Sequence, residues 1–82
     1  MSASEITYFS PFESAQWLQT RLSNLQIGTL QRLSEMTEID KGTLSRYFRH
    51  ERRPSIDCIG PLCQALKTPP EQLLKVLGAI PK

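Results

Sequence analysis

The stretch TLQRLSEMTEIDKGTLSRYFR, residues 29–49, decides the fold of this chain. Thr29 has the side chain of a helix N-cap, and the residues after it predict a short helix that ends near Met36. The expected apolar face of this helix consists of Leu30, Leu33 and Met36. Residues 37–39 are the expected turn that follows it.

A second short helix is expected from Lys41 to about Arg49, because Asp40 is a favourable N-cap. Its inward stripe is expected to consist of Leu44, Tyr47 and Phe48. At ~100° per residue, the opposite face carries Gly42, Ser45, Arg46 and Arg49, with Thr43 at its edge. Gly42 costs up to ~1 kcal/mol relative to alanine in a helix. Two explanations stay open for it: close approach of a neighbour to the backbone, or tolerance near a helix start.

The positive charge of the chain is concentrated in and just after this second helix. Residues 41–53 carry five cations against the single carboxylate of Glu51, although the whole chain has a net charge of only +2. Four of these cations are arginine, which suits the recognition of phosphates and base edges. Charge alone would equally describe a solvated surface. Two helices joined by a short turn, the second basic on its outer face, describe a helix-turn-helix.

A longer helix is expected before this pair. Ser10-Pro11-Phe12-Glu13 is a capping box with proline at the first helical position. The helix is expected from Pro11 to about Leu25. Its apolar residues recur close to a helical period: Phe12, Ala15, Leu18, Leu22 and Leu25.

Two more helices are expected after the pair, which gives an all-α, compact five-helix domain without strands. Ser55 can start the fourth helix, but Gly60-Pro61 falls inside it, so that this helix either bends there or begins near Pro61. Thr68-Pro69-Pro70-Glu71 is a second capping box, and it opens a last helix that ends at Leu77 before Gly78.

With 82 residues, the chain is expected to form one domain. The expected organisation is an N-terminal extension at 1–10, the helical domain at 11–77 and a C-terminal tail at 78–82. No apolar run is long enough to span a membrane, and the N-terminus lacks the pattern of a secretory signal. A cytoplasmic location is therefore expected. Because 82 residues leave no room for it, a small-molecule effector domain is not expected.

Few side chains offer catalytic or metal-binding chemistry. His50 is the only histidine, and it stands between Arg49 and Glu51. The two cysteines, Cys58 and Cys63, are expected to be reduced thiols, with at least Cys63 in the core. We therefore expect no catalytic residues, no metal and no cofactor, and an enzyme is disfavoured.

The stretch LQRLSEMTEIDKGTLSRYFRHERRPSIDCIGPLCQALKTPPEQLL, residues 30–74, resembles the Xre/Cro-type helix-turn-helix family, which includes the phage repressors. The family pattern is matched without a gap through Leu33, Thr37, Ile39, Thr43, Leu44, Ser45, Arg46, Arg52, Pro54 and Ser55. The match continues through Ala65, Leu66, Pro70, Glu71, Leu73 and Leu74, and includes Trp17, Leu18 and Leu22. It covers about residues 14–77 and implies a lambda-repressor-like fold.

Several positions depart from the family pattern. Glu38 and His50 stand where the family usually has glycine, in the turn and after the second helix of the pair. Histidine is among the residues that tolerate the left-handed region. Leu30 replaces a glutamine that many members use against a phosphate, which leaves Thr29 and backbone N–H groups for that contact. Ser34 replaces a small alanine between the two helices, which we expect to be a mild change.

The resemblance implies sequence-specific binding to double-stranded DNA by a transcriptional regulator, expected to be a repressor. Its recognition helix near 41–49 would lie in the major groove, with four base-reading residues: Lys41, Gly42, Thr43 and Arg46. The expected phosphate-binding residues are Thr29, Ser45, Arg49, Arg52 and Arg53. Trp17, Tyr47 and Phe48 are expected in the core and not as a platform for base stacking.

Two further hypotheses concern partners. The alternative function is a protein-interaction module, such as an antitoxin or anti-repressor, that uses the same fold without DNA. The second hypothesis is a homodimer on a two-fold operator, because one recognition helix reads only a few base pairs. Its candidate contacts are the apolar residues of the two tails, which the five-helix core is not expected to need: Ile6, Tyr8, Phe9, Val76, Leu77 and Ile80. Equally, both tails could fold back onto their own domain.

Overall fold

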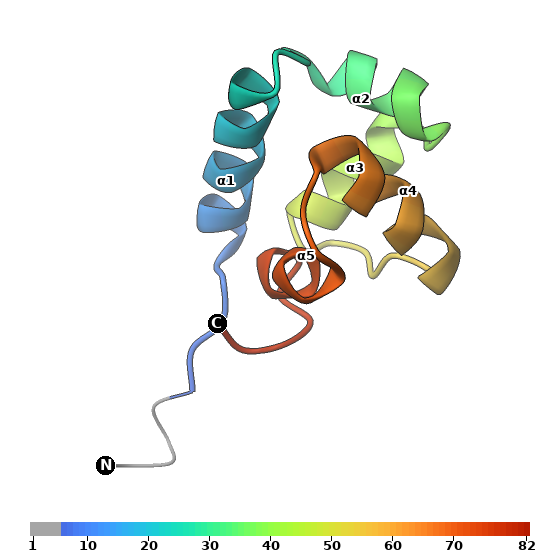
Figure 1. Ribbon diagram of the computed structural model, residues 1–82. Helices are drawn as coiled ribbons and strands as arrows, with labels where there is room; N and C mark the ends of the chain where they lie inside the picture. The colour runs from blue at the N-terminus through green and yellow to red at the C-terminus, as the bar shows by residue number, and fades with distance from the viewer. Residues whose placement is uncertain (1–5) are drawn as a thin grey trace.

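The computed structural model describes residues 6–82, so residues 1–5 of the expected N-terminal extension lie outside the described part. The described part contains five helices and no strand (Figure 1). The helices are α1 (Pro11–Asn24), α2 (Leu30–Thr37), α3 (Lys41–Phe48), α4 (Ile56–Leu66) and α5 (Pro70–Val76). The prediction of an all-α, five-helix fold is confirmed.

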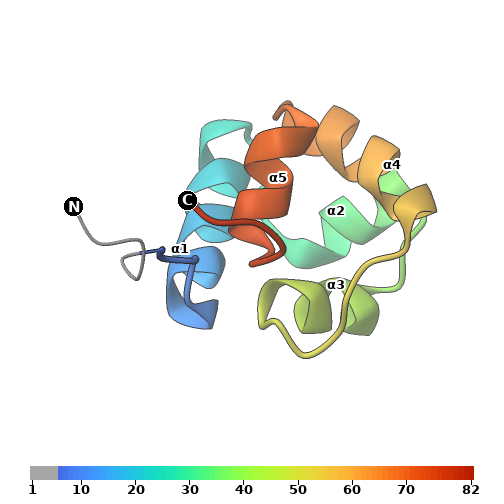
Figure 2. The same ribbon diagram turned by 90° about the horizontal axis from the view of Figure 1, so that it is seen from below.

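The helices surround one apolar core. α2 packs on α3 and α4, whereas α1 packs on α3 and α5. Figure 2 shows α5 between α1 and α4, and α5 also contacts α4. The buried core consists of Leu18, Leu22, Leu33, Leu44, Tyr47, Phe48, Leu62, Leu66, Leu73, Val76 and Leu77. Trp17 packs against it half-buried, so the aromatic residues Trp17, Tyr47 and Phe48 belong to the core as expected.

Local capping signals fixed the start of three helices. Ser10 and Glu13 form the complete capping box of α1. Thr29 Oγ1 accepts a hydrogen bond from the backbone N–H of Arg32 at the start of α2 (3.1 Å). Asp40 Oδ2 accepts one from the backbone N–H of Thr43 at the start of α3 (3.2 Å). These three N-caps are confirmed.

The second expected capping box is wrong. The N-cap of α5 is Pro69, which makes no side-chain capping bond, and Thr68 is buried before it. Pro70 at the first helical position needs no partner for a backbone N–H, which makes a side-chain cap less necessary there. At the other end α5 stops at Val76, and Gly78 follows with a φ of 76°.

Two predicted apolar stripes are confirmed only in part: Leu18, Leu22 and Leu33 are buried as expected, but one end of each stripe is exposed. Phe12 is 70% exposed and Ala15 is exposed, whereas Ser14 is fully buried. In α2 Met36, which was expected on the apolar face, is 47% exposed, whereas its neighbour Thr37 is buried. Both buried hydroxyls donate to backbone oxygens, Ser14 to Val76 and Thr37 to Leu33. Burial of these polar residues is therefore compatible with a dry core.

The uncertainty over Gly60-Pro61 has a clear outcome. α4 begins at Ile56 and continues through Pro61, so it does not start at the proline. Ser55 is the N-cap but makes no side-chain capping bond. Its hydroxyl instead donates to Cys58 Sγ (3.4 Å), while its carbonyl accepts from the Cys58 backbone N–H (3.0 Å).

The tails are held close to the domain. The backbone N–H of Lys82 donates to Thr7 O (2.9 Å), and its Nζ lies 2.7 Å from Glu13 Oε2 and 5.2 Å from the centre of the Phe9 ring. The hydrogen bond from Lys82 holds the pKa of Glu13 below its ordinary value. Figure 1 shows the C-terminus beside the segment that precedes α1.

The expectation that neither apolar tail is needed by the core is wrong for two residues. Val76 is the last residue of α5 and Leu77 is its C-cap. Both side chains are buried and line the core. Ile80 is half-buried, and Ile6 and Tyr8 are exposed.

Both cysteines are free and half-buried. Burial raises the pKa of the Cys63 thiol, which keeps it protonated near neutral pH. Within residues 6–82, no helix combines the length and apolar character that crossing a membrane requires.

Candidate nucleic-acid interface

The turn between α2 and α3 keeps the geometry of a glycine-containing turn without the glycine. Glu38 has a φ of 58°, in the left-handed region where an L-residue is strained. Ser34 Oγ donates to Ile39 O across the turn (2.6 Å), and Thr37 Oγ1 accepts from the Ile39 N–H (3.3 Å). The Ser34 hydroxyl thus stabilises the turn. The sequence had indicated only a small side chain at this position, not this hydrogen bond.

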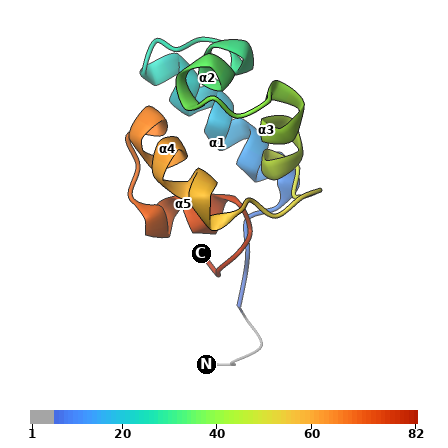
Figure 3. The same ribbon diagram turned by 90° about the vertical axis from the view of Figure 1, so that its right-hand side faces the viewer.

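α3 lies at the edge of the molecule, at the right in Figure 3. Leu44, Tyr47 and Phe48 are buried, as the helical spacing predicted. Among the four expected base-reading residues, Lys41, Gly42 and Arg46 are exposed and Thr43 is half-buried. Within residues 6–82, neither Lys41 nor Arg46 forms an ion pair. Lys41 at the start of α3 and Arg46 on its outer face are therefore two cations that pair with no carboxylate of the described residues.

Gly42 has a local explanation besides the two left open by the sequence. A Cβ at this position would lie 3.1 Å from Asp40 Oδ2, the atom that caps α3. This contact is tight for a methyl group, so an alanine would push the carboxylate away from the Thr43 N–H. Gly42 thereby leaves room for the cap of the helix.

Three of the expected phosphate-binding residues meet at one groove. Thr29, Ser45 and Arg49 lie around an open groove between α1, the start of α2 and the end of α3. The groove is completed by Ala15, Leu18, Gln19, Leu22, Gly28, Leu30 and Phe48. Thr29 accepts one hydrogen bond as the N-cap, and its hydroxyl proton remains available to an acceptor such as a phosphate oxygen.

The remaining two expected phosphate-binding residues lie on the connection between α3 and α4. Arg52 and Arg53 are exposed. Arg53 Nη1 lies 3.4 Å from Leu77 O, a long hydrogen bond to the end of α5. Arg49 Nη2 lies 3.3 Å from Glu51 Oε1, with both side chains more than half exposed. Exposed pairs of this kind contribute little to stability and separate readily.

A family model for Cro/C1-type HTH DNA-binding domains matches residues 18–77, most of the chain. The chain belongs to this family. Comparison with curated proteins and with solved structures gives no match. Membership in the family makes DNA the partner and confirms the likeness to Xre/Cro-type proteins that the sequence indicated.

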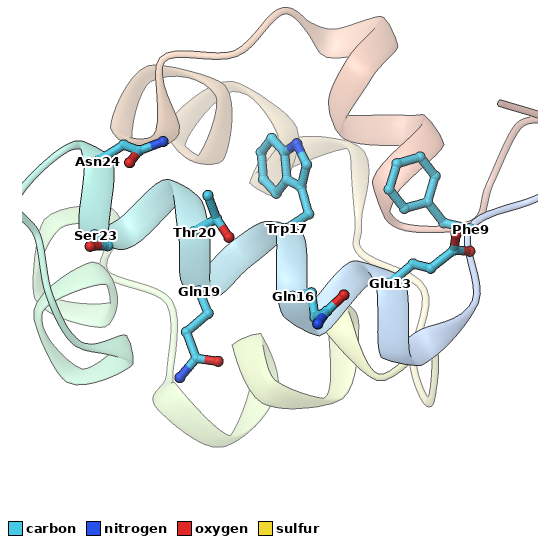
Figure 4. Close-up of a pocket in the computed structure, with 8 residues that line it drawn as sticks. All are labelled: Phe9, Glu13, Gln16, Trp17, Gln19, Thr20, Ser23 and Asn24. Carbon is cyan, nitrogen blue, oxygen red and sulfur yellow. The ribbon is translucent and has the colours of Figure 1, made fainter.

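A second concave surface of this Cro/C1-type domain lies on the outer side of α1. Figure 4 shows Trp17 and Phe9 on the side of α5, with Gln19 turned to the opposite side, toward α3. The surface is lined by Phe9, Glu13, Gln16, Trp17, Gln19, Thr20, Ser23 and Asn24. Because its only charged member is an acid, it suits a nucleic acid less well than the groove beside Arg49.

Two side chains of the Cro/C1-type domain hold contacts that the sequence did not reveal. Arg21 donates to the carbonyls at the end of α4, and His50 contacts both Ser14 and the end of α5. A histidine at a position that favours glycine was the only signal for the second. In the part of the chain from Ile6 onward, no three metal-ligating side chains cluster.

Proposed function

We propose that this Cro/C1-type domain binds double-stranded DNA sequence-specifically and acts as a transcriptional repressor, with α3 in the major groove. The supporting observation is that Lys41 at the start of α3 and Arg46 on its outer face are exposed at the edge of the molecule and form no ion pair within residues 6–82. The major groove of DNA is wide enough to admit an α-helix, and arginine and lysine side chains on that helix can contact base edges there.

The proposed contacts divide into two classes. Lys41, Gly42, Thr43 and Arg46 read base edges, with a guanidinium or ammonium on guanine O6 and N7 and the Thr43 methyl on a thymine methyl. Thr29, Ser45, Arg49, Arg52 and Arg53 contact phosphates, which fixes the register without reading sequence. The meeting of Thr29, Ser45 and Arg49 at one groove supports this division.

The proposed operator has two-fold symmetry and binds two copies of the chain. One recognition helix reads only a few base pairs, and paired half-sites about one helical turn apart supply the missing specificity. Burial of Val76 and Leu77 removes them from the candidate contacts, which leaves Ile6, Tyr8, Phe9 and Ile80.

Selection of bound sites from random duplexes tests the function, followed by binding of the selected duplex over a range of salt concentrations. We expect a defined site and an affinity that falls steeply with salt, since released counterions drive phosphate binding. Binding to all duplexes alike would contradict sequence specificity. Absence of duplex binding at low salt would favour the protein-interaction alternative.

A further inference from the structure

The imidazole of His50 joins three segments that are distant in sequence. Its Nε2 lies 2.7 Å from Ser14 Oγ in α1 and 3.1 Å from Val76 O at the end of α5. The ring also fills the space beside Gly78, where a Cβ would come within 2.8 Å of a ring carbon and 2.9 Å of Nδ1. His50 itself directly follows the C-cap of α3, with a φ of 61°.

The order of donors in this cluster is defined by the chemistry of its atoms. Val76 O can only accept, and the Ser14 hydroxyl donates its one proton to it. The Ser14 oxygen then accepts from His50, which places the ring proton on Nε2. The last carbonyls of a helix have no partner within the helix, so the cluster satisfies one of them for α5.

The same connection is held at two other points. The backbone N–H of Glu51 donates to Arg46 O (2.9 Å) and that of His50 to Tyr47 O (3.1 Å), the two bonds of a Schellman motif. Arg53 reaches Leu77 O, the carbonyl next to the one that His50 contacts. The connection that carries Arg52 is therefore anchored to the end of α5 by side chains on both sides of it.

We propose that His50 is a positioning residue for DNA binding, a proposal that rests on the proposed phosphate contacts of Arg49 and Arg52. Glycine would meet the backbone geometry at this position with less strain, but it could not reach α1 and α5. The imidazole instead holds the end of α3 and the following connection in the orientation in which the flanking arginines meet the backbone of the duplex. Because these groups are already ordered before binding, complex formation loses less conformational entropy.

Two substitutions of His50 distinguish the effect of its side-chain contacts from the effect of its backbone conformation. His50→Asn keeps a residue that tolerates the left-handed region, but its amide is too short for Ser14 and Val76. His50→Gln places an amide nitrogen near the position of Nε2, and Gln26 shows that this chain accepts a glutamine at positive φ. Gln26→Asn is the matched control, since Gln26 occupies the same backbone region (φ of 60°) with an exposed and uncharged side chain.

The readouts are affinity for the selected duplex, thermal stability, and amide exchange of residues 50–53 in the free protein. We expect His50→Asn to weaken binding about three- to tenfold, because one side chain and the connection it holds must then be ordered on binding. We also expect faster amide exchange at residues 50–53. His50→Gln should recover most of the affinity, and Gln26→Asn should bind as the wild type does. Ser14→Ala, which removes one partner of the ring, should weaken binding less than His50→Asn.

Wild-type affinity in His50→Asn would overturn the proposal, and so would equal loss of affinity in the Asn and Gln variants. An equal loss in Gln26→Asn would also overturn it, because general destabilisation would then explain the effect. If His50→Asn does not fold, wild-type affinity in Ser14→Ala overturns it instead. Failure of the wild-type chain to bind any duplex is a different result, which contradicts the proposed function.

Discussion

Arg21 of α1 donates from Nε to the backbone oxygen of Leu66, the last residue of α4, at a distance of 2.8 Å. Its Nη2 donates to the next carbonyl, that of Lys67. Carbonyls at a helix C-terminus lack partners within the helix and carry partial negative charge, so a guanidinium is well suited to them. α1 is thereby joined to α4.

Arg21→Ala should lower the free energy of unfolding by about 1–3 kcal/mol, because two carbonyls lose a charged donor. For a domain of this size, each kcal/mol lowers Tm by roughly 4–8 °C. Thermal unfolding followed by circular dichroism measures the effect. Arg32→Ala is the control, since the Arg32 side chain is exposed and pairs with the exposed Glu35 (3.5 Å). Equal melting temperatures of the two variants would show that the Arg21 contacts contribute nothing.

Arg46→Ala should weaken binding to the selected duplex by ~1–3 kcal/mol and relax preference at one base pair, since a bidentate contact with guanine would be lost. Arg46 is exposed on the outer face of α3, so its removal should leave Tm nearly unchanged. Affinities for the selected duplex and a random duplex are compared. A loss of the same size on both would assign Arg46 to phosphate binding.

Arg52→Ala should weaken binding to all duplexes alike and reduce the slope of log K against log salt by about one. Arg52 is preferred to Arg53 for this test, because Arg53 also contacts Leu77 O and its loss could alter the fold. Lys75→Gln on α5, where Lys75 pairs with Glu71 (3.9 Å), is the control and should leave the slope unchanged. A slope unaffected by Arg52→Ala would show that this arginine only solvates the connection.

Sequence patterns predicted best the features that depend on neighbouring residues. The caps at Ser10, Thr29 and Asp40 are set by side chains that reach three residues along the chain, and each was predicted correctly. Exposure of Phe12 and Met36 was not predicted. In short helices, adjacent rows both fit the apolar spacing, and only tertiary packing decides which row turns inward.

The contacts of Ser14 and His50 could not be predicted from neighbouring residues, and a histidine at a position that favours glycine was the only signal for them. These residues are 36 positions apart, and their hydrogen bond depends on how α1, α3 and α5 meet. Arg21 and Leu66 are 45 positions apart, and nothing in the sequence around Arg21 distinguishes it from a solvated arginine. The expected base-reading and phosphate-binding residues followed from resemblance and helical spacing, and their roles remain predictions.

The left-handed residues that end the helices provide a test of backbone strain. Glu38 and Lys67 have φ values of 58° and 51°, and both side chains are exposed. Replacing either by glycine relieves strain of about 1–2 kcal/mol, partly offset by the greater freedom of glycine in the unfolded chain. We expect each variant to be more stable by up to ~1 kcal/mol in urea unfolding. A loss of stability in Lys67→Gly or Glu38→Gly would contradict this account of the helix ends.

Two copies of the chain are expected on each operator. Light scattering of the purified complex gives the stoichiometry, and Tyr8→Asp and Ile80→Asp then test the two tails separately, with folding checked for each. Loss of the second copy in one variant would place the contact on that tail.

Leu77→Asp is unsuitable for this purpose because Leu77 is buried in the core, and we expect that variant to unfold. One copy per duplex, with selected sites that lack two-fold symmetry, would refute the dimer. Two copies retained in both variants would instead show that the tails only fold back onto their own domain. The hydrogen bond between Lys82 and Thr7 is a contact of that kind.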